Sequence, residues 1–169
     1  MTIIEKRVLV HPSVRIGHYS IVGEGSSIKA NSVIGDFVRI GKNCLIGENV
    51  VLKPAIILAD GTTIGNSAFL GPGVITLREQ IPGSRGPEIG ENAFIGAGTV
   101  ILPGLALGRN AAIGAGAVVT KNIPDDSGTW VGCPVRRLKP KVAPTMCLRF
   151  PEKSNKINLL RELAKARNR

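Results

Sequence analysis

The stretch IKANSVIGDFVRIGKNCLIGENVVL, residues 28–52, decides the fold, because an aliphatic residue returns at every sixth position along it. The same spacing extends in both directions from this stretch. In chain order the residues are Val10, Ile16, Val22, Ile28, Ile34, Ile40, Ile46, Leu52, Leu58, Ile64, Leu70 and Thr76, and then, after an interruption, Ile89, Ile95, Ile101, Leu107, Ile113 and Val119. A helical period fits nowhere before residue 150, so these units are not helices.

Two further features of each unit predict its shape. Gly follows the aliphatic residue in eleven of the eighteen units, and a small or β-branched residue usually stands four places after it. Two inward positions in six residues, with Gly at a corner, describe a short strand followed by a tight turn. The pattern therefore predicts an all-β fold, a left-handed parallel β-helix of hexapeptide repeats. Three units close one turn, and residues eighteen apart stack at the strand spacing of ~4.8 Å.

The repeat defines a β-helix domain over residues 1–135, interrupted once. Residues 77–88, LREQIPGSRGPE, break the frame and contain the Pro and Gly of a loop. Such loops on repeat scaffolds often carry the functional site, and a tolerated surface insertion is the alternative. After Val119 the segment TKNIPDDSGTWVGCPVRRL is expected to leave the coil.

The remaining residues, 136–169, form a basic C-terminal extension. They carry eleven Lys or Arg and two acids, whereas residues 1–135 are nearly neutral. A short α-helix is predicted at about 154–168, with Ser154 as its N-cap and an apolar face of Ile157, Leu160 and Ala164. Docking of that face on the body is favoured over attachment to a membrane.

Composition limits the classes of function. The formal net charge is +10, yet aromatic residues are 4% of the chain, and the stacking aromatics or groove-entering motifs of nucleic-acid readers are not visible, so no nucleic-acid partner is expected. No apolar run approaches the ~20 residues of a transmembrane helix. Three cysteines without paired spacing, and no secretory leader pattern, predict a reduced cytoplasmic protein.

Residues 87–124, PEIGENAFIGAGTVILPGLALGRNAAIGAGAVVTKNIP, followed by VGCPVRRL at 131–138, resemble the last coils of coenzyme-A-dependent acetyltransferases. The chain is thus identified as a member of the hexapeptide-repeat acyltransferase superfamily. It is similar to sugar-nucleotide N-acetyltransferases and to serine acetyltransferases. The resemblance implies a homotrimer with sites between protomers, and acetyl-CoA as the acyl donor.

The same resemblance suggests which residues bind the donor. The pantetheine arm would bond to the backbone at Ala97 and Ala115, the corners of the two IGAG motifs. Lys121, Arg136 and Arg137 would meet the coenzyme A phosphates, since their point charges and bidentate donors suit phosphate oxygens. The alternative for each basic residue is a solvated surface charge.

The motif that supplies the catalytic base in serine acetyltransferases is incomplete in this chain. Gly86 stands where their histidine would be, and the Q-N-N sequence of some sugar-nucleotide enzymes is also missing. His18, eighteen residues before Asp36, and Glu79, in the loop, are the two candidate bases. Each could equally be an ordinary surface charge.

The loop arginines Arg78 and Arg85 are candidate substrate-binding residues. No metal site is expected, since the two histidines of the chain cannot form the three-histidine zinc site of the related carbonic anhydrases. We therefore expect transfer of acetyl to an amine or hydroxyl of a sugar or sugar nucleotide. The alternative is a non-catalytic scaffold whose basic tail binds an acidic partner.

Overall fold

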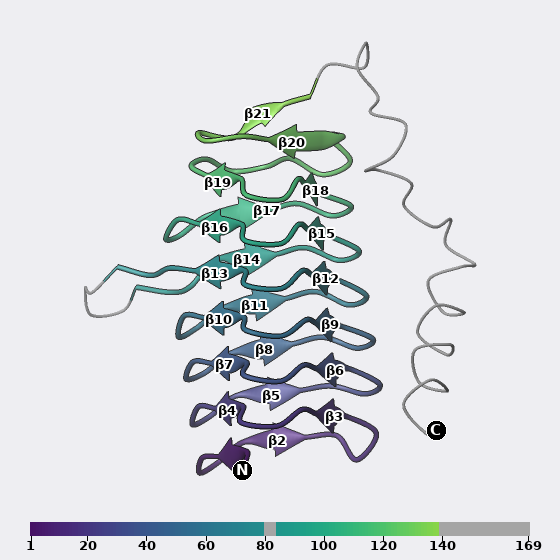
Figure 1. The fold of residues 1–169 in the computed structure, drawn as a ribbon, viewed down its shortest axis with the longest axis vertical. Helices are drawn as coiled ribbons and strands as arrows, with labels where there is room; N and C mark the ends of the chain where they lie inside the picture. The colour runs from purple at the N-terminus through teal and green to yellow at the C-terminus, as the bar shows by residue number, and fades with distance from the viewer. Residues whose placement is uncertain (80–83, 139–169) are drawn as a thin grey trace. The chain divides into compact units, whose positions relative to one another are not determined.

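The computed structural model describes residues 1–79 and 84–138, and these form the predicted left-handed parallel β-helix of about seven turns (Figure 1). Three sheets, A, B and C, form the sides of the coil. As far as Val119 the strands are all parallel, and successive strands belong to A, B and C in rotation. Residues 1–138 form one compact unit. The predicted C-terminal helix at 154–168 lies outside the described residues.

Nearly all of the strands are two residues long. Sheet A contains β1 (Ile3–Ile4), β4 (Ile21–Val22), β7 (Arg39–Ile40), β10 (Ile57–Leu58), β13 (Ile75–Thr76), β16 (Val100–Ile101) and β19 (Val118–Val119). Sheet B contains β2 (Leu9–Val10), β5 (Ser27–Ile28), β8 (Leu45–Ile46), β11 (Thr63–Ile64), β14 (Glu88–Ile89) and β17 (Ala106–Leu107). Sheet C contains β3 (Arg15–Ile16), β6 (Val33–Ile34), β9 (Val51–Leu52), β12 (Phe69–Leu70), β15 (Phe94–Ile95), β18 (Ala112–Ile113), β20 (Thr129–Val131) and β21 (Arg136–Arg137).

The register confirms the eighteen-residue turn. Val33 lies beside Val51, and Ile34 beside Leu52. Across the interruption the step rises to 25 residues, as Phe69 lies beside Phe94, so one turn is seven residues longer than the others. The predicted loop boundary shifts by one residue, because Glu88 is the first residue of β14 and pairs with Thr63.

The predicted inward row forms the core. Its members from Val22 to Val119 are at most 2% exposed. In the second inward row, four places later, Val14 is followed by three buried serines, Ser20, Ser26 and Ser32. Each serine hydroxyl donates to a carbonyl fifteen residues ahead and accepts an N–H eighteen residues ahead, as Ser26 does with Gly41 (2.8 Å) and Cys44 (3.0 Å). Because each buried hydroxyl both donates and accepts a hydrogen bond inside the coil, its removal from water leaves no polar group unpaired. The core therefore tolerates the three serines.

Thr76 is the one polar member of the aliphatic row, and the loop that follows it accounts for a polar side chain at this position. Its Oγ1 accepts the Ala59 N–H at 2.8 Å and lies 3.1 Å from the Thr62 hydroxyl. The backbone leaves the regular coil at this point, and a hydroxyl supplies hydrogen bonds inside the stack where a methyl group would supply none.

The expectation that the chain leaves the coil after Val119 is wrong. Ile123 bridges Leu107, β20 pairs in parallel with β18, and β21 folds back antiparallel on β20. Ile123, Trp130 and Val135 are buried, so this segment adds a further turn and covers the end of the core. The six-residue pattern does not detect this turn. Ile123 pairs with Leu107, 16 residues earlier, and Trp130 with Ile113, 17 residues earlier, whereas the regular turn has eighteen residues.

Among the residues that the structure describes, no helix is long and apolar enough to cross a membrane.

Candidate functional site

Ala97 and Ala115 lie on one long edge of the coil, where the chain passes from sheet C to sheet A; we call it the CA edge. Two stacked rows of turn residues form it. The first row is His18, Asp36, Pro54, Pro72, Ala97 and Ala115, and the second is Tyr19, Phe37, Ala55, Gly73, Gly98 and Gly116. The stacking predicted for Ala97 and Ala115 is confirmed, because the Gly116 N–H donates to the Ala97 carbonyl at 2.8 Å.

The C-terminal half of the CA edge is bare of large side chains. Gly73, Gly98 and Gly116 have φ of 65° to 67°, a left-handed conformation that glycine adopts without strain. A Cβ atom built on any of the three would meet no atom within 4 Å. The three glycines therefore allow the left-handed turn and leave open space above their backbone. We call the surface formed by Gly73, Gly98 and Gly116 the glycine floor.

Two backbone donors point out of this half of the edge. At other corners, the N–H two places after the inward aliphatic is bound by an Asp or Asn side chain of the next turn, as Glu48 N–H is by Asn66 Oδ1 (2.9 Å). Ala115 stands at the equivalent position above Ala97, and its methyl side chain has no oxygen to accept the Ala97 N–H. Within residues 1–79 and 84–138, neither the Ala97 nor the Ala115 N–H has a protein acceptor, and both residues are exposed. The pair is available to hydrogen-bond an extended ligand.

The loop residues lie on a different edge, where the chain passes from sheet A to sheet B; we call it the AB edge. Arg78 pairs with Asp60 (Nη2–Oδ2 3.1 Å), which fastens the base of the loop to the turn before it. The Ser84 hydroxyl donates to the Glu79 carbonyl, and Glu79 and Arg85 are exposed. Because sheet A separates the two edges, one chain does not bring Glu79, Arg78 or Arg85 to Ala97 and Ala115.

Gly86 cannot be replaced by a histidine in this backbone. It is buried, its N–H donates to the Asp60 carbonyl (2.9 Å), and an added Cβ would lie 2.8 Å from the Thr62 nitrogen. The departure from the serine acetyltransferase motif is therefore built into the packing of the loop against the coil.

His18 stands at the N-terminal end of the CA edge. Asp36 lies above it as predicted: Oδ1 accepts the His18 N–H at 2.7 Å and lies 3.5 Å from the imidazole Nδ1. The His18 side chain is 79% exposed. Four rungs separate it from Ala97, which is about 19 Å at the strand spacing.

The three proposed phosphate ligands gather at the C-terminal end of the coil. Lys121 Nζ lies 5.0 Å from the centroid of the Trp130 ring, a cation–π contact. In the antiparallel pairing of β20 and β21, Arg137 is opposite Trp130 and Arg136 is opposite Val131, and both arginines are exposed. The end cap thus collects positive charge beyond Ala115.

Sequence reasoning missed two aromatic residues of the CA edge. The Tyr19 and Phe37 rings stack with centroids 5.4 Å apart and planes 11° apart, and each residue is 62% exposed. The signal was present in the repeat, since both residues stand three places after the inward aliphatic, where glycine and asparagine usually occur.

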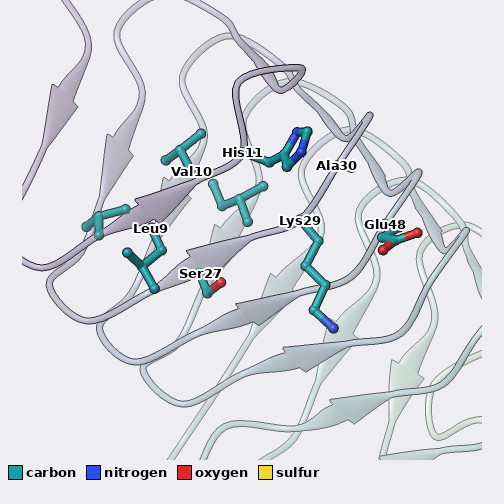
Figure 2. Close-up of a pocket in the computed structure, with 9 residues that line it drawn as sticks. Leu9, Val10, His11, Ser27, Lys29, Ala30 and Glu48 are labelled. Carbon is teal, nitrogen blue, oxygen red and sulfur yellow. The ribbon is translucent and has the colours of Figure 1, made fainter.

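Two hollows of the chain lie away from this edge, on the outer side of sheet B. One, of about 550 Å³, is lined by residues that include Leu9, His11, Lys29 and Glu48, and Figure 2 shows these side chains spread along an open surface. His11 is used locally, with Nδ1 2.9 Å from the Ser13 hydroxyl. Neither hollow contains a residue of the CA edge.

The outer side of sheet A is apolar for most of its length. Its outward residues are Ile3, Ile21, Arg39, Ile57, Ile75, Val100 and Val118. Ile57 is 45% exposed in the single chain. This face connects the CA edge to the AB edge, so a copy packed against it would lie next to both.

The sequence profile of the bacterial transferase hexapeptide (six repeats) family matches residues 1–36, 20–54, 37–72 and 86–121, well over half of the chain. The resemblance inferred from the repeats is thereby confirmed. No curated protein matches the sequence.

Solved structures similar to this chain include several acetyltransferases. One is a mutant of the perosamine N-acetyltransferase from Caulobacter crescentus in complex with CoA and GDP-perosamine, with 29% identity over 80% of this chain and 55% of that one, and a TM-score of 0.39. Another is the acetyltransferase domain of PglB from Neisseria gonorrhoeae in complex with acetyl coenzyme A, with 25% identity over 78% and 57%, and a TM-score of 0.47. The chain therefore spans little more than half the length of either protein.

A third is the polySia-specific acetyltransferase NeuO, with 19% identity over 86% of this chain and 70% of that one. Its TM-score of 0.62 reflects a shared fold.

Proposed function

The chain belongs to the bacterial transferase hexapeptide family, and we propose that it transfers an acetyl group from acetyl-CoA to an amine or hydroxyl of a sugar or sugar nucleotide. The observation that carries the proposal is the pair of N–H groups at Ala97 and Ala115 beside the glycine floor, which have no acceptor within residues 1–79 and 84–138. The similar perosamine N-acetyltransferase structure contains CoA and GDP-perosamine, and the similar PglB domain contains acetyl coenzyme A, which agrees with this choice of substrates.

The spacing of the two donors suits the pantetheine arm. Its two amides are about 5 Å apart when extended, from standard bond lengths, and the two N–H groups are one rung, ~4.8 Å, apart. The Ala97 and Ala115 N–H groups would each donate to one amide carbonyl. The bare floor would let the thin chain approach the backbone.

The direction of the arm follows from charge. Lys121, Arg136 and Arg137 lie at the C-terminal end of the coil and would bind the coenzyme A phosphates. The sulfur would then point toward the N-terminal turns. It is about 4 Å beyond the last amide nitrogen, which places it near the rung of Gly73.

Acetyl-CoA supplies an acetyl group activated as a thioester. The acceptor nitrogen or oxygen forms a bond to the acetyl carbon, the carbon–sulfur bond breaks, and coenzyme A leaves as the thiolate. The acceptor loses one proton, which a general base would hold. An amine acceptor that is already neutral needs little help from the enzyme in this step.

Geometry separates the two candidate bases. His18 is on the CA edge, yet its rung lies about 14 Å from that of Pro72 and Gly73. Glu79 is on the AB edge and would reach the sulfur of a site formed with a second copy. We therefore propose Glu79, supplied across a subunit boundary, as the base, with Arg85 beside the acceptor, and assign Arg78 to holding the loop through Asp60.

This arrangement requires an oligomer, and we propose a homotrimer. The apolar outer side of sheet A would be buried between copies, and each loop would come to a neighbour's CA edge. A site shared in this way explains why the single chain separates the loop residues from the glycine floor.

The proposal is tested by isothermal calorimetry with coenzyme A and by release of free thiol from acetyl-CoA in the presence of amino sugars. Binding of coenzyme A with one site per chain is the expected result. Failure to detect heat at millimolar coenzyme A, with the protein folded by circular dichroism, would refute the assignment. A Glu79→Gln variant should bind coenzyme A normally and lose turnover.

A further inference from the structure

The stacked rings of Tyr19 and Phe37 lie on the CA edge in the same row as the glycine floor, on its N-terminal side. On one side Phe37 is covered by the Tyr19 ring. On the other side the same position of the next turn is Ala55, followed by Gly73, Gly98 and Gly116. A face of Phe37 therefore looks along the floor toward the rung where the sulfur is expected.

The backbone at these two aromatic residues is strained. Tyr19 and Phe37 both have φ of 57°, a left-handed conformation that large side chains rarely adopt. Asparagine fills the corresponding position at Asn31, Asn43 and Asn49, with φ of 53° to 59°. Large, exposed rings where asparagine would fit better are a feature that folding does not explain.

The space in front of Phe37 has a definite length. Two rungs separate Phe37 from Gly73, about 10 Å at the strand spacing. That distance accommodates the acetyl group and one six-membered sugar ring. A pyranose presents a row of C–H bonds on one face, which packs well against an exposed aromatic ring.

Building on the proposed acetyl transfer, we propose that Phe37, backed by Tyr19, is the acceptor subsite: the pyranose ring of the acceptor stacks on the free face of Phe37 with its amine or hydroxyl directed to the thioester. The two residues select a sugar ring over an open-chain amine. They touch the acceptor and take no part in proton transfer.

Fluorine NMR on protein labelled with 4-fluorophenylalanine tests this contact directly. The chain has four phenylalanines, and the signal that disappears in a Phe37→Asn variant identifies Phe37. Phe69 and Phe94, stacked on each other on sheet C, serve as internal references. With coenzyme A present, glucosamine and GDP-perosamine should shift the Phe37 signal, while ethanolamine should leave it unchanged.

Kinetics of Phe37→Asn provide the second measurement. The KM of the variant for glucosamine should rise by about tenfold, which corresponds to the loss of one aromatic stacking contact. Its KM for acetyl-CoA should stay the same. The midpoint of urea unfolding should stay the same or rise, because asparagine suits the left-handed turn. Ser67→Asn is the control, since Ser67 has φ of 58° on the edge between sheets B and C, and its replacement should leave the acceptor KM unchanged.

The outcomes separate this inference from the proposed function. If the sugars shift Phe37 no more than Phe69 and Phe94, or if Phe37→Asn leaves the acceptor KM of an active enzyme unchanged, the subsite is refuted and acetyl transfer stands. If coenzyme A does not bind while the sugars still shift Phe37, acetyl transfer fails and the sugar contact stands.

Discussion

Replacing Ala115 with asparagine should give the Ala97 N–H an acceptor within the protein, and so make it unavailable to a ligand, without disturbing the coil. Ala115 stacks one rung above Ala97, as Asn66 does above Glu48, and the Asn66 Oδ1 accepts the Glu48 N–H at 2.9 Å. An asparagine at 115 would therefore bind the Ala97 N–H in the same way. The new side chain would also stand beside the glycine floor.

The expected sizes follow from the hydrogen bond exchanged. The fold should gain up to about 1 kcal/mol of unfolding free energy, the net value of one exposed hydrogen bond. Binding of coenzyme A should weaken by at least about tenfold, because one hydrogen bond to the pantetheine arm is lost and the new side chain occupies its path. Stability and affinity thus change in opposite directions.

Urea denaturation and calorimetry with coenzyme A measure the two quantities on the same samples. Glu91→Asn is the matched control. Glu91 stands at the equivalent position of the edge between sheets B and C, above Asn66, so the variant should gain the same hydrogen bond with unchanged affinity for coenzyme A. Equal coenzyme A affinities for Ala115→Asn and wild type would show that the Ala97 N–H and the floor beside it are not the binding surface.

Three further variants test other parts of the structure. Gly86→Ala should lower the free energy of unfolding by about 1–3 kcal/mol, the usual result of overpacking, because its Cβ would press on Thr62; an unchanged urea midpoint would contradict the packing described for the loop. Burial raises the pKa of the Cys44 thiol from 9.0 to about 11, so the neutral thiol is favoured in the folded state and the stability that it contributes is lost as pH rises from 9 toward 11. Wild type should lose about 2 kcal/mol over that range relative to Cys44→Val, and parallel pH curves for the two proteins would refute this. Ile57→Glu, on the outer side of sheet A, should convert the proposed trimer to a monomer of 17.8 kDa in analytical ultracentrifugation, and a variant that remains trimeric would place the interface elsewhere.

The sequence determined the fold and the register, because a six-residue period leaves few ways to bury one side of a strand. Val22, Ile40 and Leu58 were assigned to the core from spacing alone, and each is at most 1% exposed. Stacking of Ala97 below Ala115 followed from the same arithmetic. The cap built by Ile123 and Trp130 was missed, because its spacing departs from the period.

Only the tertiary structure decided which edge each residue occupies in relation to the others. Counting residues places Glu79 near Ala97 along the chain, yet sheet A separates them in space, and no local pattern encodes that separation. The same holds for the Ala97 N–H, which has no acceptor in the described part of the chain, since whether a backbone group is available depends on the side chain one turn away. Local periodicity fixes how a coil is built, whereas the chemistry of its surface depends on contacts between residues eighteen or more positions apart.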